Sequence, residues 1–409
     1  MIFKEFNLNE KIEKSLEENS YINPTPIQEK VIPLILQSND VIAKAQTGSG
    51  KTAAFVLPIL NHYLLNIKEG KPKIRTLVLA PTRELTLQIA NTFETFGSKF
   101  EQVLKVVSII GGQSIGEQLL DIQKGCDIVV ATPGRLLDII DKKQINLENL
   151  EFFVLDEADK MLDLGFAEEL DLILKQLPSK RQNLLFSATY PQKMKQIASL
   201  ITENPIEVSI QNEEPTVQLI KQRAIEVNME NRNALLRQLI SSNSWEQVLV
   251  FMANNRAADN IAAKFRKYNF DAESFHGDLT QEDREYTLKE FKDKKIKILF
   301  SSDIAARGLD IDNISCIINF DLPRSPADYI HRIGRSGRAG REGLAISFIT
   351  LENSEHFKLI EKRAKIKLER EQVEGFERVG TVLKKQKGKE PVKGKRKSKK
   401  DKLREQKQK

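Results

Sequence analysis

The sequence predicts an α/β protein with two tandem parallel-sheet domains and a basic, disordered C-terminal tail. Short apolar runs alternate with amphipathic stretches, the same rhythm appears in both halves of the chain, and the last part of the chain loses it. A chain of 409 residues can hold two domains of about 100–200 residues each. Its 40% hydrophobic content is enough for two ordinary cores.

The apolar runs predict strands that are buried on both faces. Such near-continuous runs are typical of parallel sheets that helices cover on both sides. They lie at residues 40–45, 75–80, 103–110, 126–131, 152–157 and 183–189 in the first half, and at residues 247–252, 271–276, 295–303, 315–320 and 344–349 in the second. The intervals can hold crossover helices, and residues 52–66 and 83–96 have helical apolar spacing. We therefore expect one α/β unit used twice.

The domain boundaries follow from changes in composition. Residues 211–217 (QNEEPTV) are polar and interrupted by proline, which predicts a linker between a first domain at 1–210 and a second at 218–372. Residues 373–409 are Lys-rich and lack apolar periodicity, which predicts disorder.

The basic charge of the chain is concentrated in this tail. The net charge is +7, but the segment from Arg378 to Lys409 has 15 Lys and Arg against 3 Asp and Glu, and so carries +12. The first 377 residues carry −5. A tail of this kind usually meets a polyanion, and nucleic acid is the first candidate. A passive solubilising tail is the alternative.

Composition also excludes several classes of protein. Cys126 and Cys316 lie in different halves beside apolar runs, so we expect buried, reduced thiols and no zinc site. No apolar run reaches the roughly 18 residues of a membrane span. The first residues contain no apolar stretch of the kind found in signal peptides, so we expect a cytoplasmic protein.

The segment AQTGSGKT has the composition and position of a phosphate-binding loop. It follows one predicted strand and precedes a predicted helix, where glycines let backbone N–H groups and the helix dipole meet phosphate oxygens. In this hypothesis Lys51 reaches the β- and γ-phosphates of a nucleotide and the Thr52 hydroxyl binds Mg²⁺. A flexible surface loop is the alternative. The candidate binding residues are Ala45, Gln46, Thr47, Gly48, Ser49, Gly50, Lys51 and Thr52.

A pair of carboxylates follows another predicted strand. In FFVLDEAD, at residues 152–159, four apolar residues lead into Asp156 and Glu157, at the strand end where α/β sheets present their ligands. We expect Asp156 to hold Mg²⁺ through water and Glu157 to accept a proton from the attacking water. By itself the pattern also fits a helix start whose acids favour the helix dipole.

The residues DEAD resemble the motif that defines the DEAD-box RNA helicases, and the resemblance extends over about residues 3–350. It implies two RecA-like domains, ATP with Mg²⁺, and RNA as partner. The segment PTPIQ resembles the family's adenine-reading Q motif, so by resemblance Gln28 reads the adenine edge and Phe3 stacks on the ring. An ordinary core aromatic is the alternative for Phe3. Ser20 stands where the family usually has Gly.

The second half has no phosphate loop with strand context, but it has the arginine-rich segment HRIGRSGRAGR at residues 331–341. Arginine is suited to a finger that reaches across a domain cleft, because its guanidinium is always charged and fits phosphate bidentately. By resemblance, Arg335 and Arg338 contact the γ-phosphate and Asp310 touches the ribose. A solvated basic face is the alternative.

Further residues are expected to couple ATP to RNA and to hold the RNA. Ser187 and Thr189 of the segment SAT could bond Asp159, the last residue of DEAD. We expect His331 to take part in the same coupling between ATP and RNA. Loop and strand-end groups of both halves offer backbone N–H, hydroxyl and Arg contacts to phosphate and sugar, which carry little base information. These RNA candidates are Pro81, Thr82, Arg83, Gly112, Thr132, Pro133, Arg135, Gly277, Arg284, Ser302 and Arg307.

The resulting hypothesis is an RNA-stimulated ATPase that acts by cleft closure. ATP and RNA would each favour the closed state, and closure would hold one strand in a shape that a duplex cannot adopt. An ATP-dependent RNA clamp and a DNA translocase are the alternatives. The sequence looks most like the bacterial RhlE branch, which implies a monomer acting in ribosome assembly or RNA turnover, with ribosomal or RNA-degradation proteins as partners.

Overall fold

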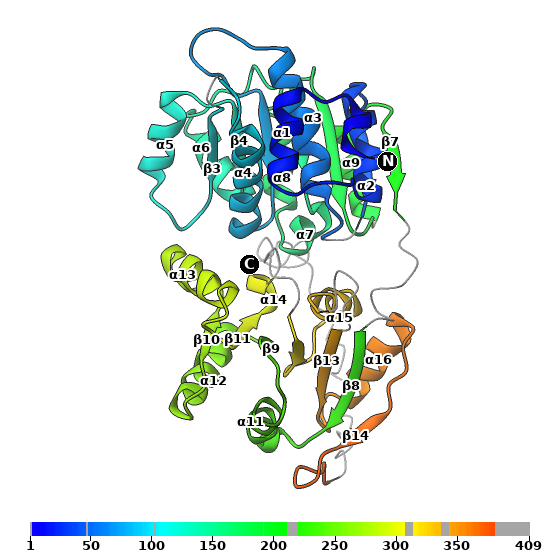
Figure 1. Ribbon diagram of the computed structural model, residues 1–409. Coiled ribbons are helices and arrows are strands. Elements are labelled where there is room, and N and C mark those ends of the chain that lie inside the picture. Colours follow the sequence, from blue (N-terminus) through cyan, green and yellow to red (C-terminus); the bar gives the residue numbers. More distant parts are fainter. Residues whose placement is uncertain are drawn as a thin grey trace, which may run out of the picture.

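The computed structural model describes residues 2–45, 48–101, 104–190, 192–210, 220–306, 314–336 and 343–380. These residues form two domains, each built on a seven-stranded sheet (Figure 1). The predicted linker and several predicted site residues lie outside the described residues: Gln46, Thr47, Arg307, Asp310, Arg338 and residues 211–217, together with the tail from residue 381.

The first domain contains the sheet β3-β4-β2-β5-β6-β1-β7, in which all the pairs are parallel. Its strands are β1 (Val41–Lys44), β2 (Thr76–Leu79), β3 (Val106–Ile109), β4 (Ile128–Ala131), β5 (Phe152–Leu155), β6 (Gln182–Ser187) and β7 (Ile206–Ser209). Its helices are η1 (Phe3–Phe6), α1 (Glu10–Glu18), α2 (Pro26–Leu36), α3 (Lys51–Leu65), α4 (Arg83–Gly97), α5 (Ile115–Lys124), α6 (Pro133–Asp141), α7 (Ala158–Asp163), α8 (Ala167–Leu174) and α9 (Gln192–Ile201).

The second domain repeats this arrangement with the order β10-β11-β9-β12-β13-β8-β14, again with parallel pairs throughout. Its strands are β8 (Ile220–Glu226), β9 (Val248–Met252), β10 (Ala272–Phe275), β11 (Ile298–Ser302), β12 (Cys316–Asn319), β13 (Gly343–Ile349) and β14 (Arg370–Gln372). Its helices are η2 (Met229–Asn231), α11 (Arg232–Ser242), α12 (Asn255–Lys267), α13 (Gln281–Lys292), α14 (Asp303–Ala306), α15 (Pro326–Ile333) and α16 (Ser354–Ala364).

The central strands of both sheets are buried on both faces. Neighbouring residues of a strand point to opposite sides, so Val41 joins one apolar core of the first domain and Ile42 joins the other. In β12, Cys316 and Ile317 are divided in the same way between the two cores of the second domain. This burial explains why the central strands are almost entirely apolar in sequence.

The predicted pair of tandem parallel-sheet domains is confirmed, and each of the eleven apolar runs overlaps a strand. The identical strand order also confirms one α/β unit used twice. The sequence analysis missed β7, β8 and β14, because their sequences (IEVS, IKQRAIE and REQ) contain polar residues and form no continuous apolar run.

The chain just after β14 still contacts the second domain. Val373 and Phe376, which the sequence analysis placed in the tail, pack against the core that β12 also fills. The guanidinium of Arg378 lies 2.6 Å from a carboxylate oxygen of Glu226.

Across the described residues, no helix has the length and apolar character needed to cross a membrane.

Candidate active site

The glycine-rich loop lies between β1 and α3, where the sequence placed it. Gly48 and Gly50 have φ angles of 81° and 93°, in the left-handed region that favours glycine. Lys51 begins α3, and its buried ammonium donates a hydrogen bond of 3.0 Å to the carbonyl oxygen of Ala45. Thr52 follows in the first turn of α3. A lysine and a helix N-terminus therefore meet at one place, which is the arrangement that binds phosphate.

Gln28 connects this loop to the start of α2. Its Oε1 accepts a hydrogen bond of 2.9 Å from the backbone N–H of Thr25, and its Nε2 donates one of 3.0 Å to the carbonyl oxygen of Gly50. A Cβ at Gly50 would lie 2.5 Å from Nε2 of Gln28, so only glycine leaves room for this contact. Gln28 thus holds the loop from the side, and its reading of adenine remains a prediction.

The aromatic residue expected to stack on adenine lies in the core of the first domain. Phe3 is 4% exposed and packs against Phe6 and Tyr21, with ring centroids 5.9 and 6.4 Å away. The structure therefore gives Phe3 a packing role, and stacking on adenine remains a prediction. Tyr21, the exposed member of this group, is 41% exposed.

Two buried carboxylates follow β5. Burial raises the pKa of Asp156 to about 6, and the charge of Lys51 opposes this rise. Glu157 has a positive φ of 49° and accepts a hydrogen bond of 2.6 Å from the ammonium of Lys160. Burial lowers the pKa of Lys160, Glu157 opposes that effect, and the charge of Arg335 lowers the pKa further. The site is therefore a buried cluster of charges that interact with one another.

The last residue of DEAD is bonded to the SAT segment, as the sequence analysis expected. The Asp159 carboxylate accepts hydrogen bonds of 2.8 Å from both the backbone N–H and the hydroxyl of Thr189. The Ser187 hydroxyl accepts from the backbone N–H of Asp159 at 3.3 Å and donates to the carbonyl oxygen of Thr189 at 2.6 Å. A movement of the loop after β5 must therefore move the chain after β6.

Residues of the second domain face this cluster. A small cavity of about 20 Å³ is lined by Lys160 from the first domain and by His331 and Arg335 from the second. Burial lowers the pKa of His331, and the charge of Lys160 lowers it further while Asp159 raises it. Of the two predicted finger residues, Arg335 is thus near the carboxylates, and Arg338 is not among the described residues.

The RNA candidates of the first domain gather beyond the ends of β2 and β3. Pro81 is buried just after β2, and Thr82 caps α4 by accepting a hydrogen bond of 3.3 Å from the N–H of Leu85. Arg83 packs on Gly112, where a Cβ would lie 2.3 Å from its Nη1 atom. Gly112 has a φ of 83°, so the position favours glycine on two grounds.

The remaining candidates of this domain lie at the start of α6. Thr132 is its N-cap residue and Pro133 its first residue. One turn of backbone away, Arg135 donates a hydrogen bond of 3.1 Å from Nη1 to the carbonyl oxygen of Gln113. This interaction places a guanidinium at the same end of the sheet as Arg83, beyond the C-terminal ends of the strands. The charge of Arg135 lowers the pKa of Arg83.

In the second domain, Arg284 is held by a residue of the first. Its Nε donates a hydrogen bond of 2.7 Å to Oε1 of Glu84, and its Nη1 donates one of 3.2 Å to the carbonyl oxygen of His276. Ser302 donates a hydrogen bond of 2.9 Å to Oδ1 of Asn255. A Cβ at Gly277 would have no neighbour within 4 Å, so the space beside this loop is open to a ligand.

Arg83 and Arg135 of the first domain and Arg284 of the second lie close enough to interact electrostatically. Burial lowers the pKa of Arg83, the charges of Arg284 and Arg135 lower it further, and Glu84 raises it. Because the cations outnumber the one carboxylate, an anion between them would be stabilised. A chain of phosphates has the required charge.

The sequence analysis did not identify three residues that organise the site: Glu84, Lys160 and Arg332. Glu84 lies within the segment PTREL and Lys160 directly follows DEAD, so both were adjacent to recognised motifs. Arg332 is bonded to both oxygens of Asp303 at 2.5 and 2.7 Å. The regular spacing of the arginines in residues 331–341 did not show which of them bond residues of their own domain.

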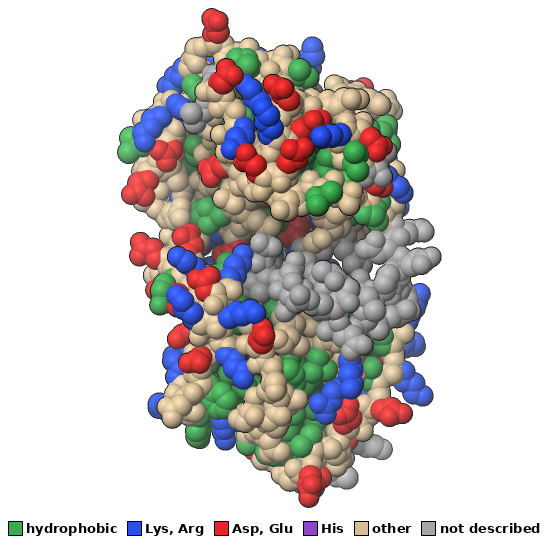
Figure 2. Space-filling model, viewed as in Figure 1, with side chains coloured by type: hydrophobic (Ala, Val, Ile, Leu, Met, Phe, Trp, Pro, Cys, Tyr) green, Lys and Arg blue, Asp and Glu red, His purple; other side chains and the backbone are tan. Residues whose placement is uncertain are grey.

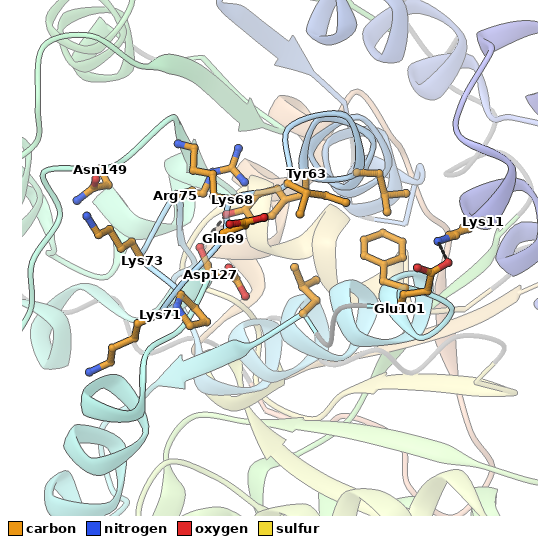
Figure 3. A pocket seen from close by; sticks show the side chains of 15 residues that line it. Lys11, Tyr63, Lys68, Glu69, Lys71, Lys73, Arg75, Glu101, Asp127 and Asn149 are labelled. Carbon is orange, nitrogen blue, oxygen red and sulfur yellow. Dashed lines mark hydrogen bonds and ion pairs between the residues drawn. The ribbon is translucent and has the colours of Figure 1, made fainter.

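A separate pocket of about 400 Å³ lies in the first domain near the N-terminal ends of β2 and β4 (Figure 3). Arg75 and Asp127, which line it, come directly before β2 and β4, whereas the phosphate loop and the two carboxylates come after β1 and β5. Lys11 and Glu101 form an ion pair of 2.8 Å at one end. None of the predicted site residues lines this pocket.

On the face seen in Figure 2, basic and acidic side chains are interspersed over both domains.

Two family descriptions match the chain. Residues 25–197 match the family described as "DEAD/DEAH box helicase", and residues 231–340 match the "Helicase conserved C-terminal domain". The first match contains the phosphate loop and both carboxylates, and the second contains Arg284 and Arg335.

Named relatives and solved structures are similar over most of the chain. The chain is 41% identical to the DEAD-box ATP-dependent RNA helicase CshA of Bacillus subtilis, over 90% of this chain and 73% of that protein. It is 39% identical to the ATP-dependent RNA helicase CshA of Listeria monocytogenes, over 90% and 69%. Among solved structures, S. cerevisiae Dbp5 bound to RNA and ADP BeF3 is 31% identical with a TM-score of 0.80, over 90% of this chain and 95% of that one. Mss116p bound to ssRNA and AMP-PNP is 28% identical with a TM-score of 0.81, over 91% and 78%.

Proposed function

Because the chain belongs to the DEAD-box ATP-dependent RNA helicases, we propose that it opens short RNA duplexes locally by closing its two domains around one ATP and one RNA strand. One observation carries this proposal. Lys160, bonded to Glu157 in the first domain, shares a small cavity with His331 and Arg335 of the second. The relatives solved with RNA and a nucleotide analogue have the same two-domain fold, which supports a ligand between the domains.

On the ATP side, each residue is assigned one task. Lys51 binds the β- and γ-phosphates, and Glu157 accepts a proton from the attacking water. Arg335 and Arg338 stabilise the charge that develops on the γ-phosphate. Phe3 and Gln28 hold the base and Asp310 holds the ribose; all these assignments come from the matching motif positions.

Mg²⁺ fits the residues on this side of the cleft. Asp156 is a buried carboxylate whose pKa burial raises, so its ionised form would be stabilised by a cation. Thr52 offers a hydroxyl one residue after the lysine of the phosphate loop. We assign both as Mg²⁺ ligands, with Asp156 acting through water. When bound, Mg²⁺ neutralises phosphate charge.

On the RNA side, the contacts go to the backbone of the strand. Arg83, Arg135 and Arg284 supply charge, and the loop at Gly277 supplies space for close approach. Binding is therefore independent of sequence. Asp159 transmits the ATP state to this region through its bonds to Thr189.

Replacing Glu157 with Gln tests the catalytic assignment. The variant should still bind ATP and RNA, but its RNA-stimulated ATPase should fall by about 10²–10⁴-fold, because an amide cannot accept the proton. Glu168→Gln, at an exposed position on α8, is the matched control. Lys51→Ala should abolish hydrolysis through loss of phosphate binding. Normal turnover by Glu157→Gln would remove Glu157 from the role of base.

Two other activities are separated by simple assays. An ATP-dependent RNA clamp would hydrolyse ATP and hold RNA without displacing a strand from a short duplex. A DNA translocase would have its ATPase stimulated by DNA as strongly as by RNA. The identity to named RNA helicases favours strand separation on RNA over both.

The biological setting is proposed from the named relatives. They are called CshA, so we propose membership of that group in place of the RhlE branch that the sequence analysis expected. We propose that the chain acts as a monomer in ribosome assembly or RNA turnover, alongside ribosomal or RNA-degradation proteins. Crosslinking the protein to RNA in cells and sequencing the bound RNA would test this setting.

A further inference from the structure

The repeated strand order assigns each position of the nucleotide site a counterpart in the second domain. Lys51 is the first residue of α3, which follows β1, and Arg232 is the first residue of α11, which follows β8. Asp156 follows β5, and Asp321 follows the matching strand β12. A cation at a helix start and an aspartate at a strand end are therefore present in both domains.

In the second domain these two residues are joined directly. Nη1 of Arg232 lies 2.7 Å from Oδ1 of Asp321 and donates a second hydrogen bond of 2.8 Å to the carbonyl oxygen of Phe320. The guanidinium also stacks on the Phe320 ring, 4.3 Å from its centroid. Residues 227–231 (VNMEN) contain no glycine, so no phosphate loop separates β8 from α11. In the second domain, an ion pair therefore occupies the position that is equivalent to the proposed nucleotide site of the first domain.

This ion pair is connected to a second arginine. The other carboxylate oxygen of Asp321 accepts a hydrogen bond of 2.9 Å from the backbone N–H of Ala253, so both oxygens are bonded. The carbonyl oxygen of Asp321 accepts one of 2.6 Å from Nη1 of Arg332. Arg332 also contacts Asn319 at 3.0 Å and both oxygens of Asp303.

Arg332 in turn fixes the segment that carries the proposed finger. It lies on α15, and its carbonyl oxygen accepts a hydrogen bond of 3.2 Å from the backbone N–H of Arg335. Arg335 is 6% exposed, and its charge reaches Lys160 in the first domain. A continuous set of contacts therefore runs from Arg232 through Asp321 and Arg332 to Arg335.

We infer that Arg232 is a positioning residue for ATP hydrolysis: the second domain's remnant of a nucleotide site is an anchor that orients Arg335. This inference rests on the proposed role of Arg335 as a finger. In this inference Arg232 acts through its contacts with Phe320 and Asp321 and not by contact with a substrate. A displacement of about 1 Å at a reacting centre can lower a rate by about 10²-fold, so a loosened anchor has a measurable effect on turnover.

The test compares Arg232→Met, Arg335→Ala and the double variant. Arg232→Met keeps an unbranched apolar stem and removes the guanidinium and its charge; we expect kcat for RNA-stimulated ATP hydrolysis to fall by about 10–100-fold. KM for ATP and the RNA affinity without nucleotide should stay within about twofold of the unmodified protein. Because Arg232 acts through Arg335, the double variant should be no slower than Arg335→Ala alone. The matched control is Arg266→Met, which breaks an exposed ion pair with Glu273 in the same domain.

Each result either supports the inference or overturns it. Loss of activity in Arg335→Ala with normal kcat in Arg232→Met would overturn the anchor and keep the finger. Normal activity in Arg335→Ala would overturn the finger, and the anchor with it. If Arg232→Met does not fold, Arg232→Lys provides the measurement, because lysine keeps the charge but cannot contact Asp321 and Phe320 in the same planar geometry. It should have an intermediate kcat, and a rate equal to that of the unmodified protein would count against the anchor.

Discussion

The ion pair between Glu84 and Arg284 joins the two domains and provides the sharpest prediction. Glu84 lies on α4 of the first domain and Arg284 on α13 of the second. Their side chains are 9% and 6% exposed, and Nε of Arg284 donates a hydrogen bond of 2.7 Å to Oε1 of Glu84. Replacing Glu84 with Gln removes the charge and keeps the shape.

The magnitude follows from what Arg284 can do afterwards. Removing one partner of a buried ion pair costs about 3–5 kcal/mol when the other partner stays buried without a compensating charge. Here the domains can separate and let Arg284 regain water, so the value for one charge-assisted hydrogen bond, about 1.5–3 kcal/mol, is the better guide. Without RNA, the closed population should therefore fall by roughly 10- to 150-fold relative to the open one.

RNA should reverse part of this effect. In the variant, a phosphate no longer competes with a carboxylate for Arg284. The dependence of RNA affinity on salt should therefore become steeper by about 0.7 log units per log unit of salt, the value for one added contact to a single strand. Closure is measured by energy transfer between dyes on the two domains with a non-hydrolysable ATP analogue, and affinity by titration at several salt concentrations.

Glu94→Gln is the control for this experiment, because Glu94 is exposed on the same helix. It should change neither closure nor the salt dependence. If Glu84→Gln closes without RNA as readily as the unmodified protein and has an unchanged salt slope, the ion pair does not hold the domains together and the reasoning above is wrong.

Three further predictions concern other parts of the chain. Gln28→Ala should weaken discrimination of ATP from GTP, measured by the ratio of kcat/KM values, and equal use of both by the unmodified protein would contradict adenine reading. Ser20→Gly should raise the free energy of unfolding by about 0.5–1 kcal/mol, because Ser20 has a φ of 60° after α1; thermal unfolding measures this, and no gain would show that the turn relaxes. Removing residues 381–409, which carry most of the basic charge of the tail, should weaken RNA binding and flatten its salt dependence by roughly 0.7 per lost contact while leaving the ATPase at saturating RNA almost unchanged. An unchanged salt slope would support a solubilising role.

The parts of the site that could be predicted are those whose chemistry is local. The phosphate loop needs glycines with positive φ, followed at once by a lysine, and this requirement is visible in eight consecutive residues. The strand runs were visible because burial on both faces excludes polar residues from them. The short edge strand β14 (REQ) contains no apolar residue, so nothing in its sequence distinguishes it from a loop.

The parts that could not be predicted depend on residues far apart in the chain. Arg284 had the composition of a phosphate contact, and its sequence gave no sign that Glu84, 200 positions earlier, holds it. Arg332 and Arg335 lie three positions apart in a regular series of arginines. Arg332 is used inside its own domain and Arg335 faces the other, a division that only the packing of α15 determines.

The cluster of Arg83, Arg135 and Arg284 has a consequence for the energy of domain closure. Closing the domains brings Arg284 of the second domain close to Arg83 and Arg135 of the first. The charges of Arg284 and Arg135 lower the pKa of Arg83, and the charge of Glu84 raises it. Closure without RNA therefore brings like charges together at the same time as it forms the ion pair between Glu84 and Arg284. A polyanion would relieve this repulsion because it acts as a counterion. The charge that attracts a polyanion therefore opposes closure in its absence, whereas the ion pair between Glu84 and Arg284 favours closure.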